Sequence, residues 1–203
     1  MKSSCRVWVL CLAENKKIVL VGIPGVGKTT LLSKMVEIIK SHDKSVSVMS
    51  FGTLMFEVAK KNGLKDRDEL RKLPVTEQQT LQKIAAEKIA VQTEQIVIID
   101  THAFINSSEG YYPGLPENVL KIIKPTNFVS ISAKPEEIYN RRMKDDTRNR
   151  DKITLTIIKK ELEIQSGMIS ACAVITGSPV KHILNREGKI DEATDKIIKA
   201  IGL

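Results

Sequence analysis

Aromatic side chains are scarce in this chain: Phe, Trp and Tyr make up only 4% of its 203 residues. Proteins that bind single-stranded nucleic acid without sequence preference stack the bases on aromatic rings, so this scarcity argues against such a surface. The formal net charge of +8 still indicates partners that carry negative charge. Because the lysines are spread along the whole chain, we expect a cleft for phosphorylated small molecules and no stable nucleic-acid partner.

Cysteines are few, and long apolar runs are absent. The three cysteines, Cys5, Cys11 and Cys172, form no Cys-x-x-Cys pair, which argues against a zinc ribbon or a redox dithiol. No apolar run approaches the roughly 20 residues that a membrane-spanning helix needs. We therefore expect a cytoplasmic protein without a membrane partner.

The first fifteen residues stand apart from the rest. Residues 6–13 are a short apolar segment, at the lower limit for the core of a signal peptide, and a charged stretch then leads directly into a predicted strand. We expect residues 1–15 to be an extension that is disordered or not native, and residues 16–203 to form one domain.

The rest of the chain is organised around residues 22–29, whose sequence Gly-Ile-Pro-Gly-Val-Gly-Lys-Thr has the spacing of a phosphate-binding loop. An apolar strand is predicted before it, over residues 17–21, and a helix with apolar residues at helical intervals after it, to residue 40. Glycines let backbone N–H groups converge on an anion, and the helix N-terminus adds partial positive charge. Lys28 would reach the β- and γ-phosphates. The predicted triphosphate site consists of Gly22, Ile23, Pro24, Gly25, Val26, Gly27, Lys28, Thr29 and Thr30.

A second nucleotide signature lies further along the chain. Residues 95–100 form an apolar strand that ends in an acid, Asp100. In a parallel sheet this carboxylate would lie near the phosphate loop, where it would orient Mg²⁺ and its waters. We expect Thr29 and Asp100 to hold the magnesium ion, partly through water.

Strands and helices alternate throughout, which predicts an α/β fold with a doubly wound, parallel, five-stranded sheet flanked by helices. Thr53, Thr76 and Asp191 are expected to start helices as N-caps or in a capping box. Residues 101–116 are expected to form a loop at the carboxyl ends of the strands, where such sheets bind ligands.

The region 51–93 holds three helical pieces and would form a small subdomain over the site. The predicted strands are residues 17–21, 46–50, 95–100, 127–132 and 180–184, and the later helices are residues 53–61, 66–73, 76–93, 135–145, 154–174 and 191–201.

Arginines gather in residues 141–151, directly after a predicted helix. Phosphoryl transfer leaves little covalent work for the protein and depends on cations held in position, and arginine binds two phosphate oxygens at once. We expect residues 142–152 to be a short lid that brings Arg142, Arg148 and Arg150 over the phosphates. Arg141 could replace Arg142.

Taken in order, six stretches resemble the archaeal-type adenylate kinases, a short-lid branch of the nucleoside monophosphate kinases with the P-loop NTPase fold. The matching stretches are residues 22–30, 51–53, 66–73, 99–102, 110–116 and 146–151. This resemblance implies reversible transfer of the γ-phosphoryl group of ATP to AMP, which gives two ADP. It also implies Mg²⁺ as the only metal, a role in nucleotide metabolism and a homotrimer.

The resemblance also implies roles for single residues. ATP would place its phosphates on residues 22–30 and its adenine on the turn at residues 176–181. Lys28, Asp100 and the three lid arginines would be catalytic. The residues implied for AMP binding are Thr53, Arg71, Thr101, His102 and Gly114.

Three alternatives stay open. Within the same class, the acceptor could be another monophosphate such as CMP. A nucleotide-gated switch or GTPase is opposed by the absence of an Asn-Lys-x-Asp motif and of a glycine three residues after Asp100. A non-enzymatic, nucleotide-dependent RNA-binding or assembly protein would fit the basic charge and conflict with the few aromatics.

Overall fold

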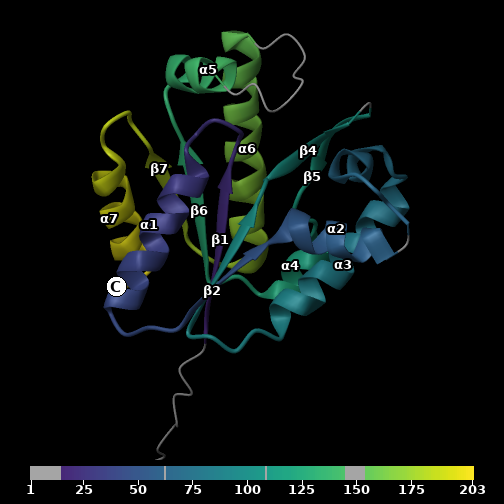
Figure 1. Ribbon diagram of the computed structural model, residues 1–203, viewed down its shortest axis with the longest axis horizontal. Coiled ribbons are helices and arrows are strands. Elements are labelled where there is room, and N and C mark those ends of the chain that lie inside the picture. Colours follow the sequence, from purple (N-terminus) through teal and green to yellow (C-terminus); the bar gives the residue numbers. More distant parts are fainter. Residues whose placement is uncertain (1–14, 62, 108, 145–153) are drawn as a thin grey trace, which may run out of the picture.

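Five parallel strands run through the middle of the molecule in the order β2-β3-β1-β6-β7 (Figure 1). The computed structural model describes residues 15–61, 63–107, 109–144 and 154–203. The predicted sheet is confirmed: its strands are β1 (Lys16–Gly22), β2 (Val46–Ser50), β3 (Ile96–Thr101), β6 (Asn127–Ser132) and β7 (Val180–Leu184).

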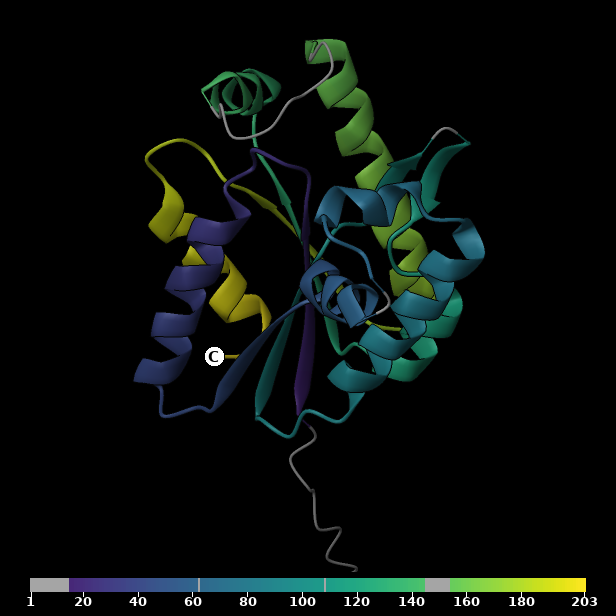
Figure 2. The ribbon, with the colours of Figure 1, turned by 45° about the vertical axis from the view of Figure 1, so that its right-hand side comes forward.

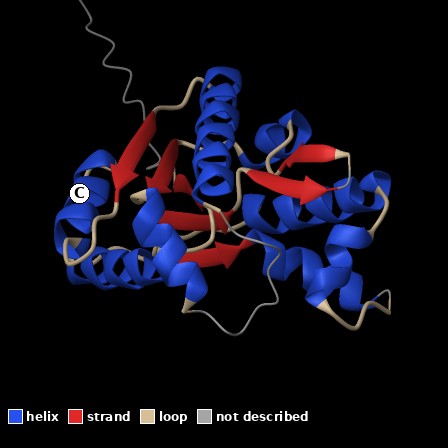
Figure 3. Ribbon diagram, turned by 90° about the horizontal axis from the view of Figure 1, so that it is seen from above, coloured by secondary structure: helices blue, strands red, loops and turns tan. Residues whose placement is uncertain are grey.

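The central strand is apolar on both faces because helices cover both faces of the sheet. Along β1, Val19 and Val21 point into one apolar cluster, and Ile18 and Leu20 point into the other. Strands buried on both sides read as continuous apolar runs, which is why residues 17–21 were recognisable as a strand. Seen from above, the strands lie between two groups of helices (Figure 3).

Helices α1 (Lys28–Ser41) and α7 (Ile190–Ala200) pack on one face, and α2 (Phe51–Lys61), α3 (Val75–Ala90) and α4 (Glu117–Ile123) pack on the other. The long helix α6 (Leu155–Thr176) reaches both clusters, through Ile158 near its start and Ile169 further on. Helix α5 (Pro135–Met143) lies beyond the carboxyl edge of the sheet (Figure 1). No helix of the described residues is long and apolar enough to cross a membrane.

Three helices begin earlier than the sequence suggested. Helix α2 starts at Phe51, directly after β2, so Thr53 lies in its first turn and is not its N-cap. Helix α3 starts at Val75 with Pro74 as its N-cap and without a side-chain cap, so the capping box predicted at Thr76 is wrong. The fixed φ of proline already suits a helix start. Helix α7 starts at Ile190, with Lys189 in place of Asp191 as the N-cap.

The segment after β3 is more regular than the predicted loop. It holds an antiparallel hairpin, β4 (Phe104–Ser107) and β5 (Gly110–Pro113), beside α6, as Figure 2 shows, and then the short helix α4. The charged stretch before α3 is a 3-10 helix, η1 (Arg67–Lys72). Four-residue strands and a seven-residue helix are too short to give a periodic signal.

Lys124 offers a test of backbone strain because it ends α4 in a left-handed conformation, with φ +53°. Burial of Lys17 lowers its pKa, and the nearby charge of Lys124 lowers it further. Lys124→Ala removes the charge but keeps the Cβ, and it should stabilise the fold by a few tenths of a kcal/mol at neutral pH. Lys124→Gly should add about 1 kcal/mol, because glycine adopts this conformation without a Cβ clash.

Urea unfolding at several pH values would measure both effects. A lowered pKa means that the fold disfavours protonated Lys17, so the charge effect should disappear as the pH rises past 10.5, the ordinary lysine value. The glycine effect should persist. Equal stability of the glycine and alanine variants would contradict a strained backbone at residue 124.

Candidate active site

The carboxyl ends of the strands meet at one edge of the sheet. In the pairing register Ser50 lies opposite Asp100 on β2 and β3, and Gly22 lies opposite Ile131 on β1 and β6. The predicted phosphate loop leaves β1 at this edge and leads into α1. Open α/β sheets bind ligands outside this edge, so the register places the candidate residues where a ligand would lie.

Glycine is required in the loop for conformational and for steric reasons. Gly25 and Gly27 have φ angles of +88° and +83°, which other residues rarely adopt. A Cβ on Gly22 would lie 2.7 Å from the Cγ2 of Val26, across the bend of the loop. These positions give the loop the curvature that lets its N–H groups face a common point.

Side chains from outside the loop hold its carbonyl groups. The Nε of Arg142 donates to the oxygen of Pro24 at 2.8 Å, and the Nδ2 of Asn185 donates to the oxygen of Val26 at 2.8 Å. Asn185 directly follows β7 and is buried. In a trans peptide group, the C=O of one residue and the N–H of the following residue point in opposite directions. A hydrogen bond that fixes a carbonyl therefore also fixes the direction of the N–H that follows it.

Two further residues complete this arrangement, which we call the carbonyl clamp: His102, Arg141, Arg142 and Asn185. The Nη1 of Arg141 donates to the oxygen of Gly25 at 3.2 Å, and the Nδ1 of His102 lies 3.0 Å from the oxygen of Gly22. The clamp residues come from the end of β3, from α5 and from the end of β7. The loop is therefore fixed by three separate elements at the same edge.

Lys28 is joined to the end of β3. Its Nζ lies 2.5 Å from the Oδ1 of Asp100 and 2.7 Å from the carbonyl oxygen of Thr101, and its side chain is 12% exposed. The two halves of the predicted nucleotide signature are thus in contact. The ammonium group lies in the first turn of α1, where it adds to the positive end of the helix dipole.

The same place offers oxygen donors for a hard cation. Thr29 is exposed in the first turn of α1, and the side chain of Asp100 is 28% exposed. Within the described residues no three His, Cys, Asp or Glu side chains gather into a metal-binding group. Mg²⁺ typically uses one or two carboxylates together with phosphates and waters, so this donor set fits it.

The residues expected at the monophosphate border the same edge. Thr53 is exposed and donates through its Oγ1 to the Oγ of Ser50 at 3.0 Å. Thr101 is buried, and His102 reaches the loop as described. Gly114 is buried against the backbone of His102 and donates from its N–H to the oxygen of Ala103 at 2.9 Å. Arg71 lies in η1, but its side chain is outside what the structure describes.

The arginines differ from one another in position. Arg142 is in the last turn of α5, and its side chain, 5% exposed, pairs with Glu161 at 2.7 Å. Arg141 is 30% exposed and lies 3.6 Å from Glu137. Arg142 thus supports the loop from the protein side, whereas Arg141 is the more exposed of the two arginines considered for phosphate binding. Arg148 and Arg150 lie outside the described residues.

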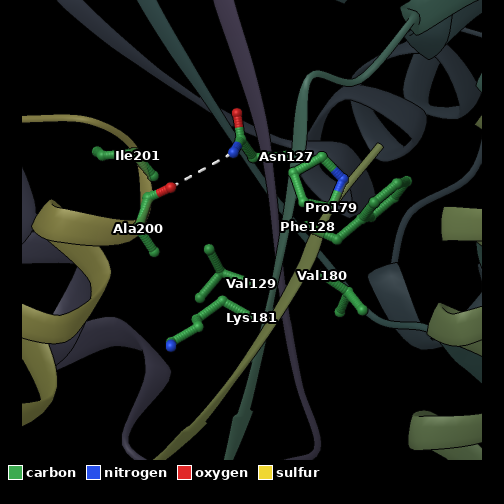
Figure 4. Close-up of a pocket in the computed structure, with 8 residues that line it drawn as sticks. All are labelled: Asn127, Phe128, Val129, Pro179, Val180, Lys181, Ala200 and Ile201. Atoms are coloured by element: carbon green, nitrogen blue, oxygen red, sulfur yellow. Dashed lines mark hydrogen bonds between the residues drawn. The ribbon is translucent and has the colours of Figure 1, made fainter. Parts of the chain in front are cut away.

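The turn expected to hold the adenine lies at the amino ends of the strands, opposite the phosphate loop. Residues 176–181 precede β7, and the oxygen of Pro179 accepts from the N–H of Phe128 near the start of β6. This expectation is wrong because the phosphate loop lies at the carboxyl ends of the strands. A pocket of about 220 Å³ opens here (Figure 4), lined by Asn127, Phe128, Val129, Pro179, Val180, Lys181, Ala200 and Ile201. The segment that follows β7 at the correct edge begins with Asn185.

Sequence reasoning missed Asn185 and Glu161. A polar residue directly after a strand is the only signal for Asn185, and it resembles many ordinary turn residues. Glu161 lies in a charged helix face, where the sequence offers no reason to single it out. Both contacts join residues far apart in the chain, Asn185 to Val26 and Glu161 to Arg142.

The fold and the loop define a P-loop nucleotide-binding protein. A model of the family described as AAA domain matches residues 21–159. Among solved structures, a shikimate kinase from Bacteroides thetaiotaomicron has a TM-score of 0.63 at 15% identity and covers 93% of this chain and 99% of its own. A gluconokinase from Sinorhizobium meliloti has a TM-score of 0.53 at 12% identity and covers 92% and 91%. These likenesses show the fold.

Sequence comparison defines the family more narrowly. The adenylate kinase of Methanocaldococcus jannaschii is 40% identical over 190 residues, covering 93% of this chain and 99% of that protein. The adenylate kinase of Thermoplasma acidophilum is 43% identical over 186 residues, covering 91% and 98%. The chain belongs to the adenylate kinase family.

Gly114 tests the close approach at the monophosphate side. A Cβ at this position would lie 2.0 Å from the carbonyl oxygen of His102, so Gly114→Ala must displace one of the two strand ends. We expect a loss of about 2 kcal/mol in the free energy of unfolding. The matched control is Gly167→Ala, in open space on α6, which should stabilise the fold by about 0.5–1 kcal/mol. Chemical denaturation measures both, and effects of the same sign would contradict this geometry.

Proposed function

We propose that this protein is an adenylate kinase that reversibly transfers the γ-phosphoryl group of ATP to AMP and forms two ADP. The observation that carries the proposal is the contact between Lys28 in the phosphate loop and Asp100 at the end of β3. It occurs in a chain that matches archaeal adenylate kinases over more than nine-tenths of its length. Within the described part of the chain, we assign Lys28, Asp100 and Arg141 to catalysis.

The loop would bind the phosphates of ATP. Its N–H groups, oriented by the carbonyl clamp, and the positive end of α1 favour bound anions. Lys28 would shift from Asp100 towards the β- and γ-phosphates, and Thr29 and Asp100 would hold Mg²⁺. The bound ion would neutralise charge on the phosphates.

The acceptor would lie under the helical subdomain. Thr53, Arg71, Thr101, His102 and Gly114 would border AMP. An AMP phosphate oxygen forms the new bond to the γ-phosphorus while the bond to the bridging oxygen of ADP breaks. Because the AMP phosphate is already an anion at neutral pH, the step needs no general base. We assign His102 to contact and to loop support, and Arg141, Arg148 and Arg150 to charge stabilisation.

The structure favours a different adenine position from the one implied by resemblance. Residues 185–189 follow β7 at the carboxyl edge, next to the phosphate loop. Asn185 already contacts Val26, and the N–H of Lys189 donates to the oxygen of Arg186 in a tight turn. We propose that backbone groups of this turn bind the ATP adenine.

The location, the metal ion and the oligomeric state belong to the same proposal. We propose a cytoplasmic enzyme of nucleotide metabolism that forms a homotrimer and uses Mg²⁺ as its only metal ion. Composition supports the location, because the three cysteines form no Cys-x-x-Cys pair. The family resemblance supports the trimer, and the donor set around Thr29 and Asp100 supports the ion.

An ADP-forming assay with ATP, Mg²⁺ and a panel of monophosphates tests the proposal. We expect AMP to have the highest kcat/KM, and a preference for CMP would reassign the acceptor. Lys28→Met removes the charge that compensates the transition state and should lower kcat by at least 100-fold, or roughly 3 kcal/mol. A wild-type protein that binds ATP but phosphorylates no monophosphate would refute the function.

Arg71→Ala separates the two nucleotide sites. Because Arg71 is assigned to the phosphate of AMP, its loss should raise the KM for AMP about tenfold or more and change the KM for ATP less than twofold. Lys61→Ala, which removes an equal charge from an exposed position on α2, is the matched control and should change neither constant. A raised KM for ATP in the Arg71 variant would place Arg71 on the wrong side of the cleft.

A further inference from the structure

Among the residues whose side chains the structure describes, Arg142 is the only charged one that is buried. Burying a guanidinium group away from water is unfavourable unless its donors are satisfied and its charge is paired. The charge is paired with a carboxylate, and two of the donors have acceptors: the Nε donates to the oxygen of Pro24 at 2.8 Å, and one Nη donates to the Oε2 of Glu161 at 2.7 Å. The guanidinium thus joins a carboxylate on α6 to a carbonyl of the phosphate loop.

We propose that Glu161 is a positioning residue for phosphoryl transfer, which acts through Arg142 on the Pro24 carbonyl and so fixes the Gly25 N–H in the phosphate loop. The inference rests on the proposed function and adds a residue that neither the motifs nor the resemblance assigned. It also gives Arg142 a role other than direct phosphate binding.

The contacts of Arg142 show how the effect reaches the loop. Its Cγ lies 3.1 Å from the place of a Cβ on Gly25, so its stem lies flat against that residue. Gly25 has a φ of +88°, and its N–H belongs to the peptide whose carbonyl Arg142 holds. A shift of the guanidinium would therefore turn a donor of the predicted phosphate-binding loop.

The helix that carries Glu161 is anchored in the apolar core. Ile158, one turn earlier on α6, is fully buried, and it belongs to the same apolar cluster as Ile138, one turn before Arg142 on α5. The two helices thus each place an isoleucine in this cluster, and they also meet at the ion pair. The planar fork of arginine has a fixed geometry, so a carboxylate at one end determines where the Nε points.

Arg141, one residue earlier, also lies between a carbonyl of the loop and a glutamate, but its contacts are longer and more exposed. Arg141 donates to the oxygen of Gly25 and lies 3.6 Å from Glu137, but its side chain is 30% exposed. Water and salt screen a pair of this kind. The Glu161 pair, with exposed fractions of 5% and 17%, is the one whose loss would leave a buried charge without a partner.

The test compares Glu161→Gln and Arg142→Lys with wild type. Glu161→Gln keeps the shape and removes the charge, and Arg142→Lys keeps the charge but cannot serve both acceptors. Both variants should lower kcat and raise the KM for ATP about tenfold, because small displacements of catalytic groups have large effects. The KM for AMP should change less than twofold. The matched control Glu163→Gln, exposed two residues away on α6, should match wild type.

Calorimetric titration with Mg²⁺·ATP supplies a readout that does not depend on turnover. The expected result is about tenfold weaker binding in both variants, at a temperature where all the proteins are folded. This readout holds even if wild type proves to use no monophosphate, so failure of the proposed function and failure of this inference are distinguishable. Thermal unfolding checks that the variants are folded.

Several results would overturn the inference. Glu161→Gln could behave like Glu163→Gln, or it could change both KM values equally. Tighter ATP binding by Glu161→Gln would also overturn it, because it would mean that Glu161 restrains Arg142 from binding phosphate directly. Rescue supplies the remaining criterion: Glu161→Asp, which keeps the charge, should recover more of the kcat than Glu161→Gln.

Discussion

The geometry of the peptide group constrains this site more than any single side chain does. A loop can point its N–H groups at a phosphate only if the carbonyl groups of the same peptides point away from it. Those carbonyls lie at the protein side of the loop, where they are partly or fully buried, so protein groups must satisfy them. His102, Arg141, Arg142 and Asn185 do this for four carbonyls of residues 22–26. The N–H groups of the loop are thus left for the ligand, and the carbonyl clamp binds the carbonyl groups on the protein side.

The parallel sheet makes this clamp possible. Because all five strands run in the same direction, the ends of β1, β3 and β7 come to one edge although they are far apart in sequence. The loop follows β1, His102 follows β3 and Asn185 follows β7, while α5 comes from the end of β6. A sheet with mixed directions would place some of these groups at the opposite edge. The fold thus supplies positions, and a small number of polar residues at strand ends supply the chemistry.

The sequence predicted the parts of the structure that have local signals. The buried strand at residues 17–21, the phosphate loop and the strand that ends in Asp100 each combine an apolar run with a distinctive neighbour, and their contact follows from a parallel sheet. The helix starts at Pro74 and Lys189 were missed because more usual capping residues stood nearby. The adenine turn was assigned to the wrong end of β7, since a motif alone does not show to which edge of the sheet it belongs.

Non-local contacts set the limit of such prediction. Nothing in a charged helix marks Glu161 as the partner of Arg142, and the sequence favoured Arg142 as a phosphate ligand for the same reason that makes it useful elsewhere: a rigid, permanently charged fork. Burial decides between the two uses. Arg142 is 5% exposed at the side chain and already has two acceptors, whereas Arg141 is 30% exposed.

The two sides of the site also differ in how firmly they are built. The ATP side rests on buried contacts, such as those of Arg142 and Asn185. On the acceptor side, Thr101 and Gly114 are also buried, but the hydrogen bond from Thr53 to Ser50 lies at the surface. Exposed hydrogen bonds exchange readily with water and contribute little net free energy, so the acceptor side can rearrange around a ligand at Thr53 at small cost. Rigidity where phosphates must be aligned and freedom where a second substrate must enter are the properties that a two-substrate phosphotransferase needs.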